Sequence, residues 1–107
     1  MSFNPNTVAA FGEAAPDVTR GLTTCAFDKD EWPMLSDAAR AKLGALADYD
    51  RVGAEFFSHV RVDLDNPAVT ALNSRGVPVL CWTIRSVDEA AEAGRVADGI
   101  TFENYRP

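Results

Sequence analysis

Short apolar runs alternate with helix-like patterns along the whole chain of 107 residues. Four segments space their apolar residues three or four positions apart, which is typical of amphipathic helices. Between and around them lie runs rich in β-branched and aromatic residues, which predict strands. The predicted strands cover residues 1–3, 18–24, 54–60, 79–84 and 99–102. Because strands and helices alternate strictly, we expect a parallel α/β sheet with right-handed crossovers.

Capping residues place the starts of the helices. An Asn-Pro pair precedes two of them, at residues 4–5 and 66–67. Asparagine caps a helix well, and proline fits the first helical position. Ser36 begins a third helix, whose apolar face extends to Ala47. Residues 86–89 read Ser-Val-Asp-Glu and predict a capping box at the fourth helix.

Two architectures fit this alternation. The continuous apolar run at residues 79–84 indicates a strand buried on both faces, as in a parallel sheet. One architecture is a small doubly wound sheet. The other is roughly half of an eight-stranded (β/α)8 barrel, whose usual length is about 250 residues. In either case residues 1–107 form a single domain or half-domain.

Composition and charge exclude several functional classes. The net charge of −6 argues against binding to nucleic acids or to anionic membrane surfaces. No apolar run approaches the roughly 18 residues of a membrane span, and the first residues lack a signal-peptide pattern. Cys25 and Cys81 stand far apart without a CxxC spacing. We therefore expect a cytoplasmic protein with reduced thiols, Cys81 being buried in its strand.

A few polar residues invite a chemical interpretation. His59, the single histidine, could be a base or a ligand, but no nucleophile or second ligand stands beside it. A structural role is the favoured prediction. Asp63 and Asp65 have a spacing that can hold a divalent cation, yet turns before helices favour the same residues. We favour the turn. The charged loop at residues 28–31 is expected to be solvated, with Trp32 folded back as an anchor.

Three residues near the ends of the last two strands are candidates for substrate binding. In a parallel barrel the C-terminal ends of the strands form the ligand face. There Trp82 could form an apolar wall, Arg85 could bind an anion through paired donors, and Glu103 ends the following strand. The alternative is a core tryptophan beside an arginine and a glutamate that form a salt bridge. Both interpretations remain open at this point.

Several segments resemble, in order, the second half of the barrel of glycerophosphodiester phosphodiesterases. The resemblance spans essentially the whole chain and is most specific at the Trp-Thr strand. The segments are 2–5 (SFNP), 15–22 (APDVTRGL), 66–83 (NPAVTALNSRGVPVLCWT) and 99–107 (GITFENYRP). The resemblance implies half of a TIM-type (β/α)8 barrel. It also implies a parent reaction in which a divalent cation, Mg²⁺ or Ca²⁺, assists hydrolysis of a glycerophosphodiester to glycerol phosphate and an alcohol.

The resemblance carries over no catalytic or metal-binding residue. In the family a His-Arg-Gly strand end, a Glu-x-Asp pair, a second His and a Glu-x-Lys all precede the "SF" strand, which here begins at Ser2. This chain alone is therefore expected to be inactive and to need no cofactor of its own. Trp82 resembles the family's aromatic wall beside the glycerol moiety. Glu103 stands in place of the family's Asp, and Arg85 replaces the usual Asn.

Three hypotheses follow. The chain is part of a phosphodiesterase that binds a glycerophosphodiester once an N-terminal half completes it, and Met1 is then an internal methionine. Alternatively, it is a non-catalytic half-barrel whose open strand edges pair with a second copy, as a homodimer, or with another chain. Alternatively, it is a small doubly wound α/β binding module that only resembles the family.

Overall fold

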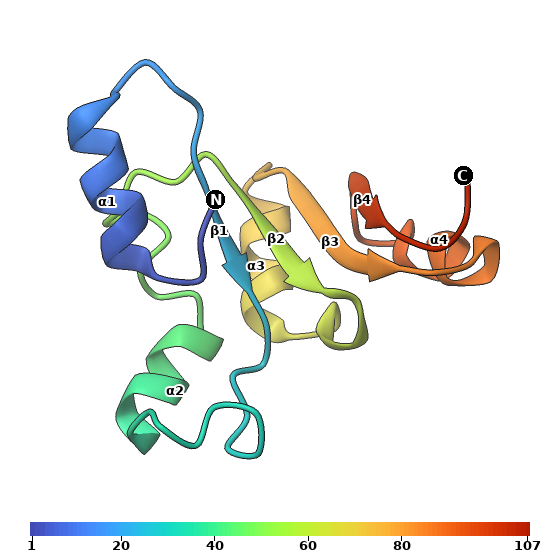
Figure 1. Ribbon diagram of the computed structural model, residues 1–107, viewed down its shortest axis with the longest axis horizontal. Coiled ribbons are helices and arrows are strands. Elements are labelled where there is room, and N and C mark those ends of the chain that lie inside the picture. The colour runs from blue at the N-terminus through green and yellow to red at the C-terminus, as the bar shows by residue number, and fades with distance from the viewer.

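The computed structural model describes residues 1–107, and it is an α/β structure with one parallel sheet (Figure 1). Four strands lie in the order β1-β2-β3-β4, each paired in parallel with the next. A single parallel bridge joins Ser2 to Leu22 outside β1. The elements are α1 (Pro5–Ala14), β1 (Gly21–Thr24), α2 (Asp37–Gly44), β2 (Phe56–Val60), the 3₁₀ helix η1 (Arg61–Asp63), α3 (Pro67–Ser74), β3 (Val79–Ile84), α4 (Val87–Ala93) and β4 (Gly99–Phe102).

The four α-helices begin at the caps that the sequence predicts. The side chains of Asn4 and Asn66 each accept a hydrogen bond from the backbone amide two residues on, at 2.9 Å. Ser36 and Ser86 each accept one from the amide three residues on, at 3.1 Å. These contacts satisfy amide donors that have no partner within the first helical turn.

Three predicted strands are shorter in the structure. The segment at residues 1–3 contributes only the bridge of Ser2, so the sheet has four strands rather than the expected five. The strand expected at residues 18–24 begins at Gly21, and the one expected at 54–60 begins at Phe56. Arg20 and Glu55 lie just before these strands, and the Glu55 amide donates to the Arg20 carbonyl at 2.8 Å.

The second helix ends earlier than predicted, and it is not the crossover between β1 and β2. α2 ends at Gly44 instead of continuing to Ala47, and Leu46 turns the chain with a φ of 53°. Figure 1 shows α2 beyond the tips of β1 and β2, at their C-terminal ends. The following turns, residues 45–53, return the chain along the sheet and place the Tyr49 ring 6.3 Å from that of Phe57.

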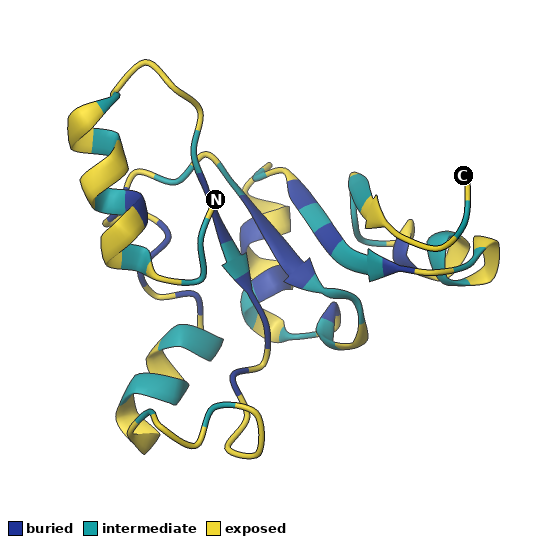
Figure 2. Ribbon diagram, viewed as in Figure 1, coloured by how far each residue is buried: buried dark blue, intermediate teal, exposed yellow.

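One face of the sheet carries the core. The register aligns Leu22 with Phe57 and Phe57 with Val79, and all three are buried. Side chains of α1, α3 and α4 belong to the same core cluster, and Figure 2 shows buried residues on the strands and on α3. The helical members are Val8, Val69, Leu72 and Ala93. These helices therefore pack on the same side of the sheet.

The opposite face of the sheet is half-exposed. Thr23, Leu80 and Trp82 point away from the core, since they alternate with its residues, and each is only partly buried. Large side chains on this face lie sideways over glycines of neighbouring strands. A Cβ atom on Gly21 would lie 2.6 Å from the Phe56 ring. The apolar residues of this face thus cover part of it without help from a helix.

The surface of the chain is large for its mass. Its accessible area is 6400 Å², whereas a compact monomer of 11.6 kDa exposes roughly 5,800 Å². No helix combines the length and the apolar character that crossing a bilayer requires. Cys25 and Cys81 are both buried and unbonded, as the sequence predicts for Cys81, and burial raises the pKa of each thiol.

We expect the substitution Gly21→Ala to destabilise the protein by about 1–2 kcal/mol, because the new methyl group displaces the Phe56 ring. Urea denaturation measures the effect. Phe56→Leu should remove much of the clash, so the double variant should lose less stability than the two single changes together. Strictly additive losses would mean that the ring does not lie over this glycine.

Candidate functional site

Trp82 spans the end of the sheet and binds its backbone. The indole N–H donates to the carbonyl oxygens of Thr24, at 3.2 Å, and Ser58, at 3.1 Å. The side chain of Trp82 in β3 therefore reaches across β2 to the end of β1. The ring of Phe3 meets the indole edge to face, with a centroid separation of 5.7 Å. Trp82 thus presents a half-buried aromatic surface that two hydrogen bonds hold in place, and its role as the apolar wall of a substrate pocket stays a prediction.

Arg85 and Glu103 neutralise each other. The guanidinium Nε lies 2.7 Å from the Glu103 carboxylate, and both side chains are about half exposed, at 54% and 49%. The backbone amide of Arg85 also donates to the Glu89 carboxylate at 2.7 Å. Glu89 thus reaches back as predicted, but to the residue before the cap and not to the Ser86 amide of a standard capping box. An exposed ion pair of this kind contributes little to stability. The structure thus brings Arg85 and Glu103 together, whereas the side-chain hydrogen bonds of Trp82 go to other residues.

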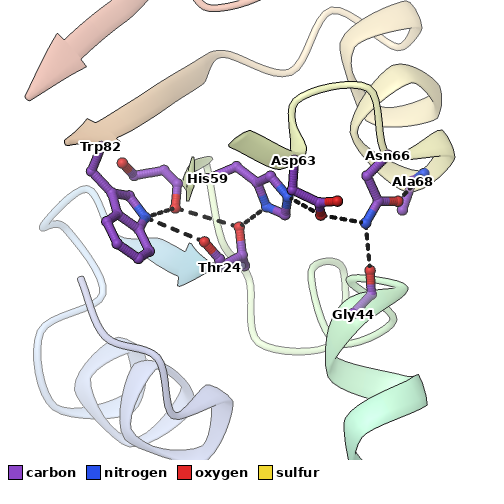
Figure 3. A network of polar contacts seen from close by, with 8 residues as sticks. Thr24, Gly44, His59, Asp63, Asn66, Ala68 and Trp82 are labelled. Atoms are coloured by element: carbon purple, nitrogen blue, oxygen red, sulfur yellow. Dashed lines mark hydrogen bonds and ion pairs between the residues drawn. The ribbon is translucent and has the colours of Figure 1, made fainter. Parts of the chain in front are cut away.

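The most connected polar site is a buried network around His59 (Figure 3). His59 is fully buried, and its Nδ1 lies 2.7 Å from the Thr24 hydroxyl. Its Nε2 lies 2.8 Å from the carboxylate of Asp63 in η1. The same carboxylate oxygen accepts from the Asn66 amide at 3.0 Å, and that amide also donates to the Gly44 carbonyl at 3.1 Å. The network ties β1, β2, η1 and the end of α2 together.

The geometry assigns the protons of this network. Burial lowers the pKa of His59 below its usual 6.5, and the Asp63 carboxylate opposes this shift without reversing it. The imidazole is therefore neutral at pH 7. Nε2–H donates to the carboxylate, and Nδ1 accepts from the Thr24 hydroxyl, whose other neighbour, the Ser58 carbonyl, is more distant at 3.4 Å. Each polar atom of the ring then has one partner.

This arrangement supports a structural role for His59. A hydroxyl, an imidazole and a carboxylate in a row are the components of a nucleophilic triad. Here, however, Thr24 is 3% exposed and His59 is 0% exposed, so a substrate cannot reach the hydroxyl. The sequence pointed to a structural histidine but missed its partners. The i,i+4 spacing of His59 and Asp63 was the available signal, whereas Thr24 lies 35 positions away in the chain.

The Asp-Leu-Asp segment forms a turn, as favoured from the sequence. Asp63 ends η1 and orients His59, while Asp65 lies in an exposed cleft between η1 and α4. No three His, Cys, Asp or Glu side chains of the chain converge on one point where a metal ion could bind. Residues 1–107 therefore offer no group of three such ligands for a divalent cation.

Comparison of the chain with family models, with curated proteins and with solved structures finds no significant match in any of the three. The resemblance to glycerophosphodiester phosphodiesterases therefore rests on the sequence motifs alone.

The single histidine gives a pH prediction with a definite sign. Because the folded pKa lies below 6.5, the unfolded chain takes up the proton first as pH falls. The neutral, buried His59 therefore contributes fully to the free energy of unfolding above about pH 6.5. Below about pH 6.5 the free energy of unfolding should decrease as the pH falls. NMR titration of the imidazole should give a midpoint below 6.5.

His59→Gln should flatten this pH dependence in urea denaturation between about pH 7 and 5.5. The paired carboxyl groups Asp48 and Asp50 do not interfere, since their pKa values lie below 3.8. A midpoint above 6.5 would show that folding favours the protonated imidazole, which would reverse the sign of this pH dependence.

Proposed function

We propose that this chain is the C-terminal half of a (β/α)8 barrel of the glycerophosphodiester phosphodiesterase type. In this proposal an N-terminal half carries the catalytic and metal-binding residues. The present chain supplies the apolar wall of the substrate pocket, with Trp82 as its main residue. The order β1-β2-β3-β4, without a reversal, is the observation that carries the proposal.

The strand order favours a barrel for a geometric reason. A right-handed crossover to the next strand, repeated in the same direction, puts each connecting segment on the same side of the sheet. A doubly wound sheet instead reverses its order once, so that helices cover both faces. Here α1, α3 and α4 share one core, and the opposite face of the sheet stays half-exposed. In a closed barrel that face becomes the packed interior.

The edges of the sheet also support the proposal. β4 has no neighbour on its outer side, and Phe102 in this strand is 50% exposed. On the other side, beyond β1, only the single bridge of Ser2 is present. Edge strands with unpaired amide and carbonyl groups invite a further strand. Added strands on both sides would close the ring and bury the excess surface.

Trp82 is suited to the wall of a substrate pocket. It lies near the C-terminal end of β3, and its two hydrogen bonds hold the ring in one orientation. The catalytic ends of barrel strands are on this side. Glu103 and Arg85 enter the proposal as an ion pair at the rim, where a polar substrate group would compete for their contact.

A second copy of the chain is the other candidate for closing the sheet. The same open edges and half-exposed face would then meet in a dimer, and the protein would be a non-catalytic assembly. The two candidates differ in where the missing strands come from.

The reading frame upstream of the Met1 codon separates the candidates. We expect it to encode His-Arg-Gly and Glu-x-Asp, and we expect the longer protein to hydrolyse a glycerophosphodiester when Mg²⁺ or Ca²⁺ is added. DNA sequencing and an alcohol-release assay measure this. An in-frame stop codon just upstream, or a longer protein without hydrolysis, would sink the proposal. Light scattering of the chain alone would then test the dimer.

In the longer protein, Trp82→Ala should raise KM by about tenfold, because roughly 1–2 kcal/mol of apolar contact is lost. Trp82→Phe is the matched variant, since it keeps an aromatic ring while it removes the indole N–H and part of the ring area. It should leave KM near that of the parent. If both variants raised KM equally, the main role of Trp82 would be its hydrogen bonds to the backbone and not contact with the substrate.

A further inference from the structure

A groove lies at the C-terminal end of β1, apart from the Arg85–Glu103 pair and the His59 network. It runs between α2, the loop at residues 27–35 and the start of α1, and its volume is about 390 Å³. Small-molecule sites usually measure about 300–1,000 Å³. The groove is therefore large enough for a small organic ligand.

The charge of the groove is positive although the chain is negative. Lys42, Asp48 and Arg51 are its only charged residues. Lys42 Nζ and Arg51 Nε both contact the same Asp48 oxygen, at 3.3 Å and 2.8 Å. Two cations thus share one carboxylate, whose pKa they hold below its usual value against the effect of burial. One positive charge remains uncompensated.

The two cations have donors to spare. Asp48 is buried, with 7% of its side chain exposed, whereas 59% of Lys42 and 51% of Arg51 are exposed. Besides the carboxylate, the Arg51 guanidinium contacts only the Asn6 side chain, at 3.3 Å. An oxyanion in the groove can therefore accept from both residues while each keeps its contact with Asp48. Arginine and lysine are well suited to this kind of acceptor.

Three aromatic residues, Phe3, Phe27 and Trp32, line another part of the groove. The ring centroid of Trp32 lies 5.0 Å from that of Phe27 and 5.5 Å from that of Phe3. Trp32 is thus folded back as the sequence predicts. The Arg40 guanidinium donates to the Trp32 carbonyl at 3.2 Å and also contacts the Leu35 carbonyl, which fixes the loop against α2. The aromatic wall is therefore built before any ligand arrives.

The backbone of Phe27 is held in an unusual conformation. Its φ is 55°, in the left-handed region, although the residue is bulky and 3% exposed. Such conformations persist where the surroundings determine them fully, and they concentrate at ligand-binding loops. Here the Phe27 ring packs against both Phe3 and Trp32, which also contact each other.

We propose that this groove binds a small organic oxyanion, a phosphate or carboxylate carried on a flat apolar group. The oxyanion lies between Lys42 and Arg51, and the apolar group lies against Phe3 and Trp32. The inference goes beyond the barrel proposal, and it can be tested on the present chain alone because every residue involved belongs to it. The groove meets the proposed apolar wall only where Phe3 contacts Trp82.

NMR titration of the 107-residue chain tests the proposal. Phenyl phosphate and benzoate are the probes, and they distinguish the two oxyanions. Inorganic phosphate has the oxyanion without the apolar group, and benzyl alcohol has the apolar group without the oxyanion. We expect saturable shifts of the Trp32 indole and the Lys42 amide with at least one probe, and about tenfold weaker binding of either half alone.

Two variants and one control sharpen the test. Lys42→Gln should weaken binding of the probe about fivefold, and Lys42→Arg should restore most of it. Lys29, in the exposed loop, lies outside the groove, so Lys29→Gln should leave binding unchanged.

Three results would overturn the proposal. The first is scattered, non-saturating shifts with both probes. The second is equal weakening by Lys42→Gln and Lys29→Gln. The third is binding of inorganic phosphate as tight as that of phenyl phosphate, which would remove the role of the aromatic wall.

Discussion

The fold depends on one constraint, the parallel pairing of each strand with the next one in the sequence. The strands follow one another in a single direction, and parallel crossovers are almost always right-handed, so connecting helices are expected on one face of the sheet. The core residues of α1, α3 and α4 agree with this expectation. That face carries the core around Phe57 and Val79. The face with Leu80 and Trp82 is covered by no helix and is only partly buried. The half-exposed face, the open edges and the large surface area all follow from this single rule of connection.

A second feature holds the C-terminal end of the sheet together. Parallel strands end side by side without a turn to join them, so their ends need cross-links from side chains. Trp82 provides one through the carbonyls of Thr24 and Ser58, and His59 provides another between Thr24 and Asp63. Both cross-links are made of fully partnered polar atoms, which is the condition under which buried polar groups are tolerated. These contacts join the C-terminal ends of β1, β2 and β3.

The sequence predicted what depends on neighbouring residues and missed what depends on distant ones. Helix starts at Asn4, Asn66, Ser36 and Ser86 were predictable, because a cap and its partner lie within three residues. The end of α2 was not, since the apolar spacing continues past Gly44 whereas the chain turns away at Leu46. Of the candidate site, the strand-end position of Trp82 was predictable from the motif. The groove was not, because Phe3, Trp32, Lys42 and Arg51 come together only through the placement of α2.

The separation of α2 from the crossover has an evolutionary consequence. The chain returns along the sheet through residues 45–53, and of α2 only its end is tied to the strands, through the Gly44 carbonyl in the His59 network. α2 is in effect an insert carried on the rim of the fold. Related sequences could exchange this insert as a unit, acquiring a new set of recognition residues while the strand order stays unchanged. We expect divergence among relatives to concentrate between residues 28 and 43, with the strands and the return segment comparatively constant.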